Sequence, residues 1–306
     1  MTARPPRGDG ASAMTLAIYL PLALGLPLML TVRWIAGRGA PGPAARGLAA
    51  VAAIAALSST WSLVLLTLTL LDDVPPLAAL DANPTLDLPE PVPGPVALIA
   101  ATLLAAVGFR LFRDLRHRLG THRQLRAVGV PAGGLVVADW ETPLAVAVPG
   151  RPGHLLVTTG ILRALDADER RVLFAHERAH LLHHHHRLVT LTAAAAALNP
   201  LLIPVRDAVA YLVERWADED AASTVGDRDL TAQAVARAAL ATVTPPPRAA
   251  LGMAGGTAVH RVQALAMPAP ARRDRRLVGP VLIAAGCLAA ITAATIEFVA
   301  VARAWL

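Results

Sequence analysis

The sequence has little charge, few aromatic side chains, no lysine and a single cysteine. Charged residues make up 16% of its 306 residues and aromatic residues 4%, whereas soluble domains carry about 25% charged residues. The single cysteine, Cys287, lies in an apolar run and excludes an intramolecular disulfide framework. The hydrophobic fraction is 55%. Together these values exclude acidic, disordered and disulfide-rich classes and favour a membrane protein.

Long uncharged runs account for the high hydrophobic fraction. A helix needs roughly 20 apolar residues to cross about 30 Å of hydrocarbon. We therefore predict a mostly α-helical membrane protein with four transmembrane helices, at about 11–32, 47–71, 91–109 and 277–302. Residues 11–109 would hold three of these helices and their loops, and 277–302 would form the last one.

The arginines predict which way these helices run. They gather between the first two runs, in 110–118 and in 272–276, whereas the loop of 72–90 carries acids and no base. Cytoplasmic loops collect arginine, so residues 110–276 are expected to face the cytoplasm. The net charge of +6 then sets orientation, and no direct binding to nucleic acid is expected.

A fifth apolar run covers residues 188–205 and is interrupted by Asn199-Pro200 and Pro204. A single crossing here would place the arginines of 272–276 outside, against the arginine rule. The run is also too short to cross twice. We predict a non-spanning segment, either buried or dipping into the bilayer, within the cytoplasmic domain of 110–276.

That domain carries an H-E-x-x-H motif, His176-Glu177-Arg178-Ala179-His180. Asp166 and Glu169 form a capping-box pattern that predicts the start of its helix. Histidines four residues apart share a helix face, so His176 and His180 are predicted to bind one Zn²⁺, with Glu177 as general base. The alternative for this short motif is a solvated helix face.

A catalytic zinc site needs a third protein ligand. Glu214 is the candidate, and Asp218, four residues later, is placed to accept the free N–H of a ligating histidine. The alternative is an exposed acidic face, because Glu219 and Asp220 follow directly. A ligand at Glu214 also requires that residues 188–205 do not cross the membrane, in agreement with the arginine pattern.

Four consecutive histidines, His183 to His186, follow the motif. They could be alternative metal ligands or stabilise an oxyanion, but we favour an interfacial polar collar before the apolar run.

The chain resembles the BlaR/MecR-type membrane zinc metallopeptidases, which act as bacterial antirepressors. The resemblance is carried by residues 155–165 (LLVTTGILRAL), by Asp168-Glu169 ahead of the H-E-x-x-H motif, by Glu214 with Ala217-Asp218, and weakly by 261–265 (RVQAL). It implies a multi-pass protein of the bacterial plasma membrane, with an α+β gluzincin-like domain between the third and fourth helices and one Zn²⁺ per chain.

The resemblance also implies roles and partners. His176, His180 and Glu214 would bind zinc, and Glu177 would be the catalytic base. The substrate strand would lie in residues 142–148, at Ala145, Val146 and Ala147, although the Asn-Ala-Phe often found there is missing. The implied substrate is a cytoplasmic protein, such as a winged-helix repressor. Whether the chain forms a homodimer stays an open question.

Antibiotic-sensing members of that family carry a penicillin-binding sensor domain after the last helix. This sequence reaches Leu306 without one and has no Ser-x-x-Lys motif, so sensing of β-lactams is not expected. Two other functions compete with regulatory proteolysis: a quality-control or prenyl-processing membrane zincin, and a metal transporter or sensor built on the histidine run. A transporter should carry polar ligands within its spans, and the predicted spans have none in their apolar centres.

Overall fold

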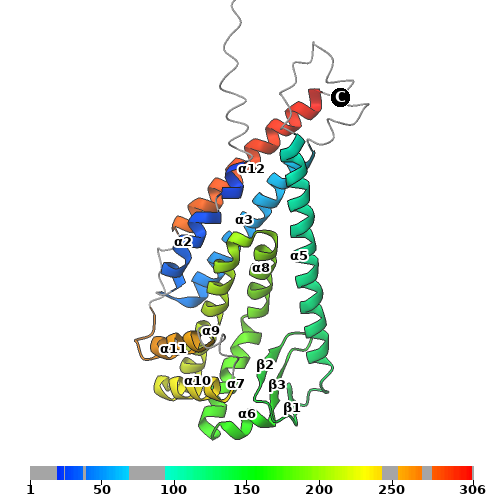
Figure 1. The fold of residues 1–306 in the computed structure, drawn as a ribbon. Helices are drawn as coiled ribbons and strands as arrows, with labels where there is room; N and C mark the ends of the chain where they lie inside the picture. Colours follow the sequence, from blue (N-terminus) through cyan, green and yellow to red (C-terminus); the bar gives the residue numbers. More distant parts are fainter. Residues whose placement is uncertain are drawn as a thin grey trace, which may run out of the picture.

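The computed structural model describes residues 19–23, 25–36, 39–68, 94–242, 254–270 and 278–304. Long helices occupy one end of the molecule, and a small sheet with shorter helices occupies the other (Figure 1). The helices and strands are α2 (Gly25–Ala36), α3 (Pro41–Leu68), α5 (Gly94–Arg126), β1 (Leu135–Ala138), β2 (Ala145–Val148), β3 (His154–Thr158), α6 (Thr159–Ala164), α7 (Ala167–Leu182), α8 (His185–Leu198), the 3₁₀ turn η2 (Pro200–Leu202), α9 (Ile203–Val225), α10 (Arg228–Thr242), α11 (Ala254–Leu265) and α12 (Val278–Ala304).

Two described helices, α3 and α5, are long and apolar enough to cross a membrane. Shorter apolar helical stretches cover Tyr19–Val32 and Gly279–Ala293. Parts of the sequence pattern lie outside the described residues, namely 11–18, the acidic loop of 72–90 and the arginines of 272–276. The structure thus supports a helical protein with at least two candidate spans.

Two helices extend beyond the predicted bounds. Helix α3 begins at Pro41, six residues before the predicted start, because proline is well tolerated in the first turn of a helix. Helix α5 does not end at Phe109 but continues to Arg126. Its second half is polar and includes an ion pair of 2.7 Å between Asp114 and Arg118, four residues apart.

The largest hydrophobic core joins α3 to α9. Buried side chains of α3, such as Leu48 and Ala52, cluster with Val205, Val209 and Leu212 of α9. The many alanines of α3 allow this close approach because they add little volume. Where α3 begins, a Cβ on Gly42 would lie only 3.0 Å from the Trp216 ring, so any larger residue there would require the ring to shift.

The apolar run of 188–205 forms a helical hairpin. Helix α8 ends at Leu198, the chain turns through Pro200–Leu202, and α9 returns alongside α8 (Figure 1). Asn199 stabilises the turn: its Oδ1 accepts from the Leu201 N–H at 3.0 Å, and its Nδ2 donates to Ser59 Oγ at 3.2 Å. This turn brings the second half of α9 back toward α7.

The sheet has the order β1-β3-β2, with β1 parallel and β2 antiparallel to β3. Helix α6 follows β3 directly and begins at a close contact. A Cβ on Gly160 would lie 2.0 Å from the Glu141 carbonyl oxygen, so only glycine fits. Thr158 completes this corner, because its hydroxyl donates to the Thr142 carbonyl at 2.8 Å. Strand β2 is thereby held at one edge of the sheet, next to α7.

Candidate metal centre

Helix α7 is fixed at its first turn. The carboxylate of Asp166 accepts from the backbone N–H groups of Asp168 and Glu169, and the Glu169 carboxylate accepts from the Asp166 N–H. This confirms the predicted capping box. Arg237 of α10 donates to the same Glu169 carboxylate at 3.0 Å. These contacts therefore fix the first turn of α7, and with it the face on which the H-E-x-x-H motif lies.

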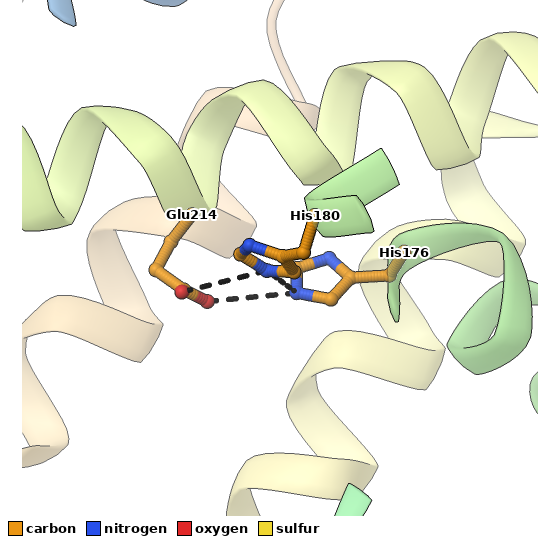
Figure 2. A group of neighbouring side chains, drawn as sticks. All are labelled: His176, His180 and Glu214. Carbon is orange, nitrogen blue, oxygen red and sulfur yellow. Dashed lines mark hydrogen bonds and ion pairs between the residues drawn. The ribbon is translucent and has the colours of Figure 1, made fainter. Parts of the chain in front are cut away.

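His176 and His180 lie one turn apart on α7 and face Glu214 of α9 (Figure 2). Their Nε2 atoms are 3.1 Å apart, and the Glu214 oxygens lie 3.5 Å from His176 Nε2 and 3.6 Å from His180 Nε2. Ligands at about 2.05 Å from a tetrahedral ion would be separated by roughly 3.3 Å. Two imidazoles and a carboxylate at this spacing could hold a zinc ion. The Glu214 side chain is 40% exposed, which leaves one side of the cluster open.

The pKa values of the two histidines are shifted in opposite directions. Burial lowers the pKa of His176, but the carboxylates of Asp218 and Glu214 outweigh it and raise the pKa to about 10. Burial also lowers the pKa of His180, here to about 4. Partial burial opposes ionisation of Glu214, yet His176 and then Arg261 overcome it and lower the pKa to about 2. Without metal, His176 is therefore the protonated, cationic imidazole of the cluster at neutral pH, and His180 is neutral.

Asp218 lies behind His176. Its Oδ1 is 3.0 Å from His176 Nδ1, the ring nitrogen that faces away from Glu214. The Asp218 side chain is 2% exposed, and a carboxylate so buried needs a compensating charge.

Arg261 of α11 supplies that charge. Its guanidinium binds both Asp218 oxygens, at 2.7 and 2.8 Å, and its Nη1 lies 3.1 Å from Glu214 Oε2. In the sequence, Arg261 stands out only as the first residue of the RVQAL segment. Its contact with Asp218 spans 43 positions, and no local pattern indicates such a pairing.

Glu177 is buried beside this cluster, 8% exposed. Burial raises the pKa of its carboxyl group, although His176 and the backbone N–H of Ala147 in β2 stabilise the ionised form. A carboxylate with a raised pKa is suited to accept and return a proton. The contact with Ala147 also places the general-base candidate next to the edge strand.

The histidine run does not form a uniform polar collar, so that interpretation is wrong for two of its members. Helix α7 ends at Leu182 with His183 as its C-cap, and His184 adopts a left-handed conformation with φ of 53°. This break starts α8 at His185 and directs its ring back toward the site. His185 is 1% exposed, with its Nδ1 3.0 Å from His180 Nδ1. His183 Nε2 lies 2.5 Å from Asp220 Oδ2.

His185 is placed to orient His180. A neutral imidazole has one N–H and one acceptor nitrogen. If His180 Nε2 faces a metal, its Nδ1 carries the proton and donates to His185 Nδ1. Burial and the neighbouring His180 lower the pKa of His185 to about 3, which keeps it a neutral acceptor. Trp216 holds this arrangement, with ring centroids 4.7 Å from His185 and 4.4 Å from His183.

Residues 113–210 match the model of peptidase family M48. The chain is a metallopeptidase. Peptidases of this family depend on a metal, and the match includes His176, Glu177 and His180, while Glu214 follows four residues after its end. Comparisons with curated proteins and with solved structures gave no match.

Zinc loading should release about one proton at pH 6. His176, with a pKa near 10, is protonated there and must lose its proton to ligate, whereas His180, with a pKa near 4, is already neutral. Water on zinc, with a pKa of about 7, stays mostly un-ionised at this pH. Calorimetric zinc titrations of metal-free protein, in buffers of different ionisation enthalpy, measure the number of protons released per zinc ion. Asp218→Asn should lower it, and a value near zero for the native chain would contradict the assignment.

His185→Phe should weaken zinc binding by about 10- to 100-fold, because it keeps the ring but removes the acceptor for His180. His185→Asn, which offers an amide oxygen in place of Nδ1, should recover most of the affinity. The matched control is His186→Phe, the same change at the next residue. Competition with a fluorescent zinc chelator gives the affinities. Equal binding by the two phenylalanine variants would rule out this role for His185.

Proposed function

We propose that the chain is an integral-membrane zinc metalloendopeptidase that cleaves a protein on the cytoplasmic side. The observation that carries the proposal is the spacing of three metal-binding side chains, His176, His180 and Glu214, with the buried carboxylate of Glu177 beside them. Zinc is the ion that best fits two imidazoles and one carboxylate with an open side.

When bound, zinc would polarise the scissile carbonyl and lower the pKa of the attacking water. Glu177 then accepts the water proton on its carboxylate and passes it to the leaving nitrogen, which its raised pKa favours. Asp218 holds His176 in position through Nδ1, and Arg261 orients the Glu214 carboxylate. Glu177 thus transfers the proton, Asp218 and Arg261 hold the metal-binding side chains in position, and the metal would supply the positive charge.

Strand β2 is the proposed docking edge for the substrate. Thr158 N–H donates to the Leu144 carbonyl, so the alternation of an antiparallel pair turns the backbone groups of Ala145 and Ala147 away from β3. The Ala147 N–H already meets Glu177. The remaining outward groups could pair with an extended peptide, and such a peptide would lie beside the metal centre.

Membrane insertion is supported by α5 as well as by α3. The apolar half of α5 exposes large side chains: Leu98 is 62% exposed and Ile99 59%. Such a surface is unfavourable in water and favourable against lipid. The arginines that follow, from Arg110 onward, support an orientation with the metal centre in the cytoplasm, in a bacterial plasma membrane.

For the biological role we propose regulatory signalling, in which the substrate is a transcriptional repressor. The support is the resemblance to BlaR/MecR-type peptidases in the sequence motifs. The alternative is quality control or prenyl-protein processing by a membrane zincin with the same metal ligands. The two differ in substrate.

Glu177→Gln should retain zinc and lower peptide-bond cleavage by 10²- to 10⁴-fold, the usual contribution of a general base. His180→Ala should lose zinc and cleavage together. Hydrolysis of labelled casein by purified protein, with zinc measured in the same samples, tests both. Full activity of Glu177→Gln would exclude the mechanism. In cells, fragments that disappear in this variant identify the substrate: a repressor supports signalling, and membrane or prenylated proteins support the alternative.

Ala145→Pro should raise KM for peptides at least tenfold, because it removes an N–H that faces away from β3 and leaves the pairing of β2 with β3 intact. Ala145→Val is the matched control, since it adds bulk and keeps the N–H. Steady-state cleavage of a fluorogenic peptide measures both variants. If proline left KM unchanged while the fold was retained, the substrate would not pair with this edge.

A further inference from the structure

A second site lies away from the metal centre, between α5 and the α8–α9 hairpin. It is a cavity of about 310 Å³. Three arginines and a histidine line it, Arg110, Arg113 and His117 from α5 and Arg206 from α9, and alanines 193, 196 and 197 of α8 form its apolar part. The cavity therefore combines positive charge with an apolar wall.

The positive charge in this cavity is only partly compensated. Its one carboxylate, Asp114, is paired with Arg118, which is not among the lining residues. Arg206 pairs with Asp207 at 2.7 Å, and Arg110 makes one long contact of 3.5 Å to the Ala196 carbonyl. Arg113 has no ionic partner within the described ranges. Guanidinium groups bind phosphate through paired N–H donors, so this cavity suits a phosphate group.

The position of the cavity indicates which kind of phosphate compound it takes. Arg110 is the first charge after the uncharged stretch of α5. Phe109 and Phe112, on either side of it, are 64% and 58% exposed. Basic side chains next to exposed apolar ones are typical of the boundary between headgroups and hydrocarbon. A ligand at this level would have a phosphate for the arginines and an apolar part for the alanines and phenylalanines.

We propose that this cavity binds the phosphate of an anionic phospholipid. The inference rests on the proposed insertion of α5 in a membrane. The headgroup bridges Arg110 and Arg113 of α5 to Arg206 of α9, the helix that carries Glu214 eight residues later. Bound lipid thus fastens the long α5 helix to the hairpin that completes the metal centre.

The test uses the full chain in detergent and short-chain phosphatidylglycerol, followed by native mass spectrometry. One variant carries Arg110→Gln, Arg113→Gln and Arg206→Gln. The matched control removes three arginines that do not line the cavity, Arg116→Gln, Arg123→Gln and Arg187→Gln. Each arginine near an anionic lipid surface contributes roughly fivefold to affinity, so the cavity variant should bind roughly 100-fold more weakly. The control should stay within roughly threefold of the native chain.

Further arms separate the possible ligands. Phosphatidylcholine tests the need for net negative charge, and inorganic phosphate tests whether the lipid tail matters. Three results would each overturn the inference. They are an equal loss of phosphatidylglycerol affinity in the two arginine variants, binding of phosphatidylcholine as tight as that of phosphatidylglycerol, and binding of inorganic phosphate as tight as that of the lipid. Zinc content and casein cleavage are measured on the same samples, so that failure of lipid binding can be told apart from failure of the proposed peptidase function. A native chain that binds phosphatidylglycerol and fails to cleave casein refutes the function alone, and one that cleaves casein without binding the lipid refutes this inference alone.

Discussion

The metal centre depends on the return of α9 to α7 after the apolar hairpin. His176 and His180 come from one helix, and the third metal-binding side chain, Glu214, follows 34 positions after His180, beyond the apolar segment. Asn199 and Pro200 follow the end of α8, and Pro204 lies in the first turn of α9, so the chain reverses direction between the two helices. If the segment continued straight, Glu214 would lie far from both histidines.

Helix α9 therefore has two environments along its length. Its first half packs Val205 and Val209 in the apolar core with α3, and its second half presents Glu214 and Asp218 to α7. A buried acid is costly in such surroundings unless it is paired. Arg261 meets this requirement for Asp218, and His176 shares the same carboxylate. Among the described residues, Glu177 and Asp218 are therefore buried at this site, whereas Glu169 and Arg215 are buried elsewhere in the fold.

Much of the candidate site could be predicted because its signals are local. Spacing of four residues places His176 and His180 on one helix face, and the Asp166–Glu169 capping box identified the start of that helix. The placement of His185 and Arg261 could not be predicted. His185 points inward only because the helix breaks at His184, and an unbroken helix would have directed its ring elsewhere. Arg261 reaches Asp218 through tertiary packing of α11 against α9. The apolar runs predicted helices but not their ends, since polar residues continue α5 well past Phe109.

The length of α5 has a mechanical consequence. Its 33 residues form a rod of about 50 Å that begins in the apolar end of the molecule and ends at the sheet. There Arg126 donates to the Pro149 carbonyl, in the turn between β2 and β3, at 3.0 Å. A tilt of about 5° at the far end of such a rod displaces this turn by roughly 4 Å. That displacement is close to the 4.8 Å or so between neighbouring strands, so even a small tilt of α5 would be large on the scale of a peptide backbone beside β2.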